Sequence, residues 1–347
     1  MAGTVRILSL DGGGIRGLIP AVALGRIAAA LGIEGRQLAE RFHLIAGTST
    51  GGIMAAGLCA PGAHRHGPKD LAELYTAQGA AIFPPDAWSR RNPLAECKYE
   101  AAALEGVLAA RLGELQLSEA KPELLVTAWD LERARPKLFC SWRARHTSSE
   151  DFRLRDVARA TSAAPTYFPP AIIHALDANY PAEQRRHALV DGGVFANDPA
   201  AVALAEARRM FPKADRALVL SLGTGSRINR IDGDKACGFG MAGWLPGLID
   251  VFMDGASALV EHELMLRQAR DELAYFRLQL ALDPPPPAYT MDDVAAPTIA
   301  GLQKLGDQVF ARFEASGALN GLRMELAKPL ASPAALGFDP DAPGPRL

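Results

Sequence analysis

Residues 42–59 read FHLIAGTSTGGIMAAGLC, and this stretch decides the fold. Its first part, residues 42–46, is a short apolar run that ends at a glycine, as buried strands do where they meet a turn. Its last part, residues 51–59, consists of small and apolar residues and predicts a tightly packed helix. A buried strand, a glycine turn and a helix form one unit of a parallel sheet that is covered on both faces.

The same unit recurs along the chain. Residues 5–10 predict an earlier strand that ends at a glycine cluster, and residues 18–31 predict the helix that follows it. Further strands are expected at residues 124–130, 137–142, 188–190 and 217–222, and further helices at 71–82, 99–112, 153–162 and 199–210. The sequence therefore predicts an α/β protein with a central, mostly parallel sheet flanked by helices.

The chain of 347 residues divides unevenly. No linker interrupts the strand and helix units between residues 4 and 226, so we expect one large domain there. Residues 227–330 are expected to form a mostly helical part packed on this domain, with helical segments at 251–282 and 299–316. Four consecutive prolines at 284–287 end the first of these segments. Residues 331–347 predict a mobile tail.

The composition excludes several classes of protein. The 37 Lys and Arg residues nearly balance the 39 Asp and Glu residues, which argues against nucleic acid as the partner. The four cysteines form no Cys-x-x-Cys pair, so we expect no metal and no cofactor. No apolar run is long enough for a signal peptide or a bilayer span. We therefore expect a cytoplasmic protein, and we leave attachment to the inner membrane surface and oligomer formation open.

The first glycine cluster, Gly12-Gly13-Gly14-Ile15-Arg16-Gly17, permits two interpretations. It matches Gly-x-Gly-x-x-Gly between a strand and a helix, which suggests a dinucleotide site. Such a site requires an acidic residue at the end of the next strand, and residues 42–46 run into Gly47 instead. The alternative is a loop of unobstructed backbone N–H groups that bind an oxyanion, with Arg16 bracing the loop or meeting an anionic head group.

The second cluster, Gly47-Thr48-Ser49-Thr50-Gly51, is more informative. Gly-x-Ser-x-Gly between a buried strand and a helix is typical of a nucleophile elbow, in which a strained turn exposes a reactive serine. The positive end of the helix dipole favours negative charge on the Ser49 oxygen. Parallel topology would place this serine beside the loop formed by Gly12, Gly13 and Gly14.

A serine needs a base to become nucleophilic. In a conventional esterase the order is serine, acid, histidine, and only His262 follows late enough, although it lies between two glutamates in an expected helix. Asp191-Gly192-Gly193 is the better candidate, because the two glycines allow close approach of the backbone. Partial burial would raise the pKa of Asp191 toward that of an effective base.

Taken together, these three segments resemble the patatin-like phospholipases, and residues 162–170 and 221–225 are similar to the same family. The resemblance covers roughly residues 4–226. It implies a three-layer α/β fold and phospholipase A-type hydrolysis of lipid acyl esters by a serine–aspartate dyad without histidine or metal. It assigns Ser49 as the nucleophile and Asp191 as the base. The remaining assignments are the oxyanion loop, Gly12, Gly13 and Gly14, and the supporting residues, Arg16, Gly47, Gly51, Gly192 and Gly193.

The resemblance also implies partners. The expected substrate is a phospholipid at a membrane surface. Some bacterial members of the family are antiviral effectors switched on by cyclic nucleotides, which makes a cyclic dinucleotide a candidate activator and residues 227–347 a candidate sensor. The alternatives are a carboxylesterase with a Ser49–Asp191–His262 triad and a nucleotide-binding sensor that does not hydrolyse esters.

The stretch at residues 236–253 is the most apolar interval after residue 226. Its large side chains predict either core packing or a lid that docks on a membrane, and the sequence does not decide between them. They are Phe239, Met241, Trp244, Leu245, Leu248, Ile249, Val251, Phe252 and Met253.

Overall fold

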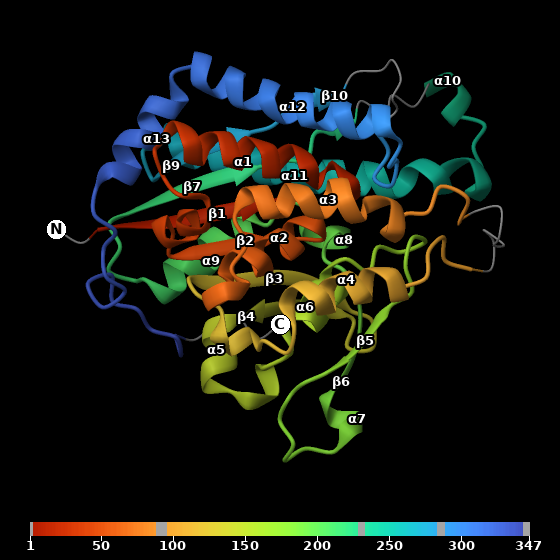
Figure 1. The fold of residues 1–347 in the computed structure, drawn as a ribbon, viewed down its shortest axis with the longest axis horizontal. Helices are drawn as coiled ribbons and strands as arrows, with labels where there is room; N and C mark the ends of the chain where they lie inside the picture. The colour runs from red at the N-terminus through yellow and green to blue at the C-terminus, as the bar shows by residue number, and fades with distance from the viewer. Residues whose placement is uncertain (1–2, 88–95, 228–232, 283–288, 343–347) are drawn as a thin grey trace.

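An eight-stranded sheet forms the middle of the computed structural model, which describes residues 3–87, 96–227, 233–282 and 289–342 (Figure 1). The strands are β1 (Thr4–Leu10), β2 (Leu44–Gly47), β3 (Glu123–Asp130), β4 (Arg135–Cys140), β5 (Ala171–His174), β6 (Arg186–Asp191), β7 (Arg216–Leu222) and β9 (Leu273–Leu278). The pairs β1–β2, β2–β3, β1–β7 and β7–β9 are parallel, and β3–β4, β3–β6 and β5–β6 are antiparallel. The predicted mostly parallel α/β sheet is therefore confirmed.

Helices cover both faces of this sheet, because neighbouring residues of its central strands point in opposite directions. Leu8 packs on one face and Ile7 on the other. The first face carries α1 (Leu18–Ala30), α2 (Thr50–Cys59), α3 (Pro68–Ile82), α4 (Ala102–Leu112), α6 (Leu154–Thr161), α12 (Ala296–Ala315) and α13 (Ala318–Ala327). The second carries α5 (Ser141–His146), α9 (Ala200–Met210) and α11 (Met241–Ala269). The short helices are α7 (Ala182–Arg185), α8 (Gly193–Ala196) and α10 (Gly233–Ala236).

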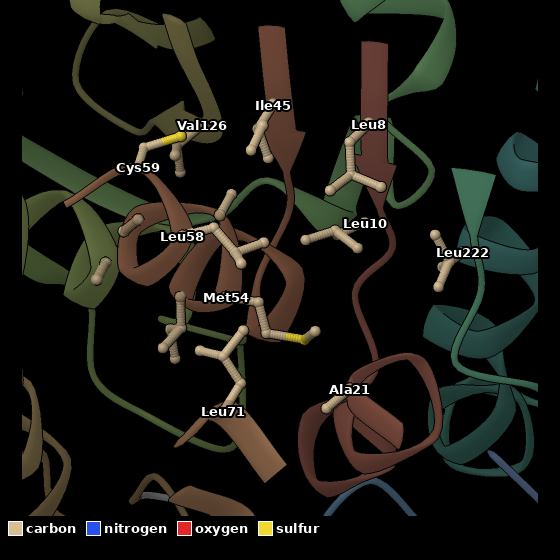
Figure 2. Packing of buried hydrophobic residues seen from close by; sticks show 14 of the residues in the cluster. Leu8, Leu10, Ala21, Ile45, Met54, Leu58, Cys59, Leu71, Val126 and Leu222 are labelled. Carbon is tan, nitrogen blue, oxygen red and sulfur yellow. The ribbon is translucent and has the colours of Figure 1, made fainter. Parts of the chain in front are cut away.

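Small residues bring α2 close to the sheet. All ten residues of this helix are buried. Figure 2 shows side chains of β1 and β2 meeting those of α1 and α2, among them Leu8, Ile45, Met54 and Leu58. The turn that precedes α2 is thereby fixed against the core.

The strand register brings two chain segments that are far apart in sequence to one point. β3 pairs with β2 over residues 123–126, with β4 over 125–130 and with β6 over 128–130. Because a strand has two edges and β4 overlaps both other partners, β2 and β6 share the opposite edge. Their carboxyl ends face each other there, with Gly47 opposite Val126 and Asp191 opposite Ala128. The carboxyl end of β1 lies beside that of β2, with Leu10 opposite Gly47.

The chain after residue 226 differs from the prediction. The segment at 251–282 was predicted to be mostly helical, but α11 ends at Ala269, β9 joins the central sheet and β10 (Ala281–Leu282) pairs with β8 (Ser226–Arg227). The helical interpretation is wrong there because β9 buries alternate residues such as Leu273 and Tyr275, as an edge strand does. The boundary predicted at residue 226 thus cuts through a sheet that β9 completes.

The C-terminal segment also differs from the expected mobile tail over its described part. Leu336 is fully buried, and its carbonyl accepts a hydrogen bond from the amide of Lys213. The ring of Phe338 lies against that of Phe211, with centroids 5.3 Å apart. Residues up to 342 are therefore packed on the second face of the sheet, and 343–347 lie outside the described residues.

Among the described residues, no single helix is long and apolar enough to cross a bilayer. The bent pair 14–30 and 35–41 satisfies the length and composition criteria only when the two helices are taken together across an 86° bend.

Candidate active site

Ser49 occupies a strained turn between β2 and α2. Its φ of 55° and ψ of −126° lie in a region that residues with a side chain rarely adopt. A Cβ atom on Gly51 would lie 2.1 Å from the carbonyl oxygen of Leu10, so no larger residue fits. The amide of Ser49 donates a hydrogen bond to Thr161 Oγ1 at 2.8 Å. The backbone thus has the sharp strand-to-helix turn that the Gly-x-Ser-x-Gly pattern predicts, with Gly47 and Gly51 at its two ends.

Asp191 ends β6 and is buried in the same place. Burial raises the pKa of Asp191 to about 7, while hydrogen bonds from the Ser49 side chain and the Gly193 amide lower it. The Gly193 amide lies 2.7 Å from Asp191 Oδ1. Gly192 is packed against β3, where a Cβ atom would lie 2.1 Å from Thr127 Oγ1. The carboxyl group therefore faces the Ser49 hydroxyl and titrates near neutral pH.

The glycine loop after β1 presents two amides rather than three. The amide of Gly12 donates to the carbonyl of Asn197 at 3.0 Å, so it is not available to a ligand. Within the described residues, the amides of Gly13 and Gly14 have no acceptor, and both glycines line the same pocket as Ser49. Gly14 has a φ of 59°. Of the three glycines in the predicted oxyanion loop, Gly13 and Gly14 therefore have amides that are free among the described residues, and Gly12 does not.

Arg16 is buried and braces this loop. Its Nε lies 3.3 Å from the carbonyl oxygen of Gly13, and its Nη1 lies 3.3 Å from that of Gly225. Of the two roles that the sequence left open for Arg16, these contacts favour bracing over a contact with a head group.

An apolar pocket extends from Ser49. Its walls include Ile53, Leu74, Ile82, Phe83, Leu104, Tyr167 and Phe168. Residues 162–168, which belong to a segment that is similar to the family, contribute to it. Among the described residues that line the pocket, Asp191 is the only carboxylate, and there is no histidine, lysine or arginine.

His262 lies elsewhere in the described structure. It is exposed on α11 and is not among the residues that line the pocket. The structure therefore does not bring the predicted alternative triad together in the pocket.

The apolar interval at 236–253 is exposed or half-buried where its side chains are described, and Phe239 is half-buried. Trp244, Val251 and Phe252 are 38%, 43% and 63% exposed, whereas Met253 lines the pocket. Core packing is therefore wrong for these three exposed side chains. Those of Met241, Leu245, Leu248 and Ile249 lie outside the described residues.

The sequence analysis did not identify four residues that lie at the site. Thr161 accepts from Ser49, Asn197 accepts from Gly12, and Met291 accepts from the amide of Ile15 through its carbonyl. Arg277 binds Asp11, which precedes the glycine loop. Asn197 follows Asp191 closely enough to suggest a shared loop, but no motif indicates the roles of the other three.

Comparisons with known proteins identify several relatives of the chain. A family model described as patatin-like phospholipase matches residues 8–204. Patatin-like protein 2 of Arabidopsis thaliana is 34% identical over 345 residues, which cover 89% of this chain and 83% of the relative. Patatin-like protein 1 of the same plant is 31% identical over 342 residues, which cover 88% of this chain and 81% of the relative. A Solanum tuberosum protein named probable inactive patatin-3-Kuras 1 is 30% identical, over 89% of this chain and 87% of its own.

Proposed function

The chain belongs to the patatin-like phospholipase family and is a lipid acyl hydrolase, and from this premise we propose that Ser49 and Asp191 form its catalytic dyad. The proposed reaction is phospholipase A-type cleavage of fatty-acyl esters in membrane glycerophospholipids. One observation carries the assignment: the only carboxylate among the described pocket residues shares that pocket with a serine held in a strained turn, and the serine side chain is near enough to lower the pKa of the carboxyl group.

Asp191 suits the role of general base because of its surroundings. An aspartate with an ordinary pKa is a weak base at neutral pH. Burial raises the pKa of Asp191 to about 7, where a carboxyl group can both accept and return a proton at neutral pH. As the oxygen of Ser49 attacks the ester carbonyl carbon, its proton passes to Asp191.

The negative charge that develops on the carbonyl oxygen needs donors. The amides of Gly13 and Gly14 line the pocket beside Ser49 and have no acceptor among the described residues, so they suit this role. The tetrahedral intermediate collapses when the leaving alcohol oxygen takes the proton from Asp191, which leaves an acyl-enzyme on Ser49. A water molecule then gives a proton to Asp191 and attacks the acyl group, and the fatty acid departs as Ser49 recovers its proton.

The pocket walls favour a long acyl chain over a polar substituent. Their aliphatic and aromatic side chains would bury methylene groups, each of which contributes about 0.8 kcal/mol when removed from water. Val194 and Met253 also line the pocket, and Val194 is 42% exposed. Exposed Val251 and Phe252 adjoin Met253 in sequence, so we assign this apolar rim to contact with the lipid surface.

The alternatives have less support. A triad with His262 would require an exposed side chain outside the pocket lining to reach Ser49. A sensor without hydrolysis would leave the strained serine and the buried carboxyl without a role. Activation by a cyclic dinucleotide and an antiviral role rest on the resemblance alone, since no contact among the described residues favours either.

The test is fatty-acid release from phosphatidylcholine vesicles, together with labelling by a fluorophosphonate probe. We expect Ser49→Ala to abolish both release and labelling, and His262→Ala to leave both within about twofold of the wild type, because surface substitutions rarely matter. Normal turnover by Ser49→Ala would reject the assigned nucleophile. Loss of activity in a folded His262→Ala variant would favour the triad.

A further inference from the structure

Arg277 places a buried positive charge behind the glycine loop. It lies on β9, and its side chain is only 6% exposed. Its Nη1 and Nη2 donate to the two carboxylate oxygens of Asp11 at 3.0 and 2.7 Å. Nη1 also lies 2.7 Å from Ser221 Oγ and 3.4 Å from Asp198 Oδ2. Two-pronged contacts of this kind fix both distance and orientation.

The strand register gives this side chain its path across the sheet. Ser9 of β1, Ser221 of β7 and Arg277 of β9 stand opposite one another on three neighbouring parallel strands. Both serines are fully buried, and larger residues at these positions would fill the space that the guanidinium occupies. Arg277 thus extends from the edge strand over β7 to the end of β1.

Two segments of the candidate active site meet at Arg277. Asp11 directly precedes Gly12, and Asp198 directly follows Asn197 on the loop that begins at Asp191. The same two segments are joined by the hydrogen bond from the Gly12 amide to the Asn197 carbonyl, 3.0 Å long. In the described part of the chain, Arg277 is the only basic side chain that pairs with either Asp11 or Asp198.

The Arg277 guanidinium offsets the negative charges of the carboxylates around it. Asp11, Asp198 and the partly exposed Glu261 all face Arg277. Without it, two buried carboxylates would lie close together with no positive charge between them. Like charges in a low-dielectric interior separate or take up protons, and either change would release the end of β1 from the loop after β6.

We propose that Arg277 is a positioning residue for ester hydrolysis, which holds the Gly13 and Gly14 amides in register with the Ser49–Asp191 pair by binding Asp11 and Asp198 together. The inference rests on the proposed function and extends it to a residue outside the segment that matches the family model. A misplacement of about 1 Å at a reacting centre costs up to about 100-fold in rate, which sets the expected size of the effect.

The test compares Arg277→Met and Arg277→Lys with the wild type in the full-length protein. The substrate is p-nitrophenyl butyrate, a soluble ester that needs no membrane. The amount of fluorophosphonate bound when labelling is complete gives the number of folded active sites. We expect kcat per labelled site to fall about 10- to 100-fold in Arg277→Met with KM within about twofold, as for a loss of transition-state geometry. Lysine keeps the charge but not the two-pronged contact, so Arg277→Lys should lose about 5- to 20-fold.

Arg143→Met is the matched control. Arg143 also makes two bonds to a buried carboxylate, at 2.9 and 3.0 Å from the oxygens of Glu206, but it joins α5 to α9 away from the pocket lining. This variant should lower the melting temperature while kcat per labelled site stays within about twofold of the wild type, because the lost pair is structural.

The outcomes separate the inference from the proposed function. If the wild type hydrolyses the ester, Ser49→Ala does not, and both Arg277 variants keep the wild-type kcat per labelled site, the inference is overturned and the dyad stands. If Ser49→Ala retains full activity, the proposed function itself fails. Should Arg277→Met not fold, the kcat of Arg277→Lys alone decides.

Discussion

Asp11 and Asp191 have the same local sequence and opposite surroundings. Each ends or directly follows a strand, each is followed by two glycines, and burial raises the pKa of each to about 7. Asp11 accepts two hydrogen bonds from Arg277, which lowers its pKa, while the nearby Asp198 and Glu261 raise it. Among the described residues, the carboxyl group of Asp191 interacts instead with the neutral Ser49 hydroxyl and the Gly193 amide. The partner, rather than the Asp-Gly-Gly tripeptide, distinguishes the two carboxyl groups, because Asp11 is bound to a guanidinium and Asp191 faces a serine hydroxyl.

The largest expected effect is on turnover. Asp191→Asn removes the proposed base and should lower kcat about 10²- to 10⁴-fold, the usual contribution of general acid–base catalysis. Asp11→Asn disturbs only the support of the glycine loop and should cost about 10- to 100-fold. Hydrolysis of p-nitrophenyl butyrate measures both. A greater loss in Asp11→Asn than in Asp191→Asn would reverse the two roles.

The stability of both variants should respond to pH in the same direction. Asp191 titrates near pH 7 in the folded protein and near pH 4 when unfolded, so its burial destabilises the fold as pH rises through this range. Asp191→Asn should therefore raise the free energy of unfolding at pH 8 by a few kcal/mol, and the gain should shrink steadily toward pH 4.

Asp11→Asn should behave in the same direction, because burial raises the pKa of Asp11 to about 7 as well, so its free energy of unfolding should rise relative to the wild type between pH 4 and pH 8. Urea unfolding of both variants measures the two changes. A free energy of unfolding that falls relative to the wild type between pH 4 and pH 8, in either variant, would contradict the raised pKa of that aspartate.

The pH dependence of activity distinguishes the two aspartates further. The ionised form of Asp191 accepts the proton of Ser49, so kcat/KM should rise with pH to a plateau, with its midpoint near pH 7. Asp11→Asn should keep that midpoint at a lower plateau. A profile that becomes flat in Asp11→Asn would assign the titration to Asp11.

The smallest expected effect concerns the rim of the pocket. Phe252→Ser should lower the rate of hydrolysis of phosphatidylcholine vesicles about threefold to tenfold, because it removes an aromatic side chain from the proposed contact with lipid. The rate of hydrolysis of the soluble ester should not change. Met324→Ser on α13 is the matched control, since Met324 is 66% exposed and is not part of the pocket lining. Equal losses in both variants on vesicles would remove the rim from the proposal.

Much of the fold follows from local sequence. The central strands β1, β2, β3 and β7 are apolar runs bounded by glycine or polar residues, and each was predicted within a few residues of its bounds. β9 was not, because Leu273–Leu278 follows a long helix and its alternation is visible only once β7 lies beside it. Leu336 was missed for the same reason: its burial depends on a surface that the rest of the chain builds.

The candidate site divides in the same way. Ser49 and Asp191 lie in glycine motifs, and the spacing of the glycines predicts the sharp turn at each residue. The assignment of the two residues as a dyad stays a prediction. The occupied amide of Gly12 could not be foreseen, because its acceptor, the carbonyl of Asn197, is a backbone atom with no sequence signal. Arg277 lies 266 positions from Asp11, and only the strand register brings the two together.

The late position of β9 in the chain has a consequence for biosynthesis. A ribosome releases Ser49 and Asp191 well before Leu273–Leu278 emerges, and domains begin to fold as they emerge. Until that last strand docks, the growing polypeptide lacks the edge of its sheet and the guanidinium behind the glycine loop. On the proposed role of Arg277, the glycine loop is therefore positioned only after most of the chain has been synthesised.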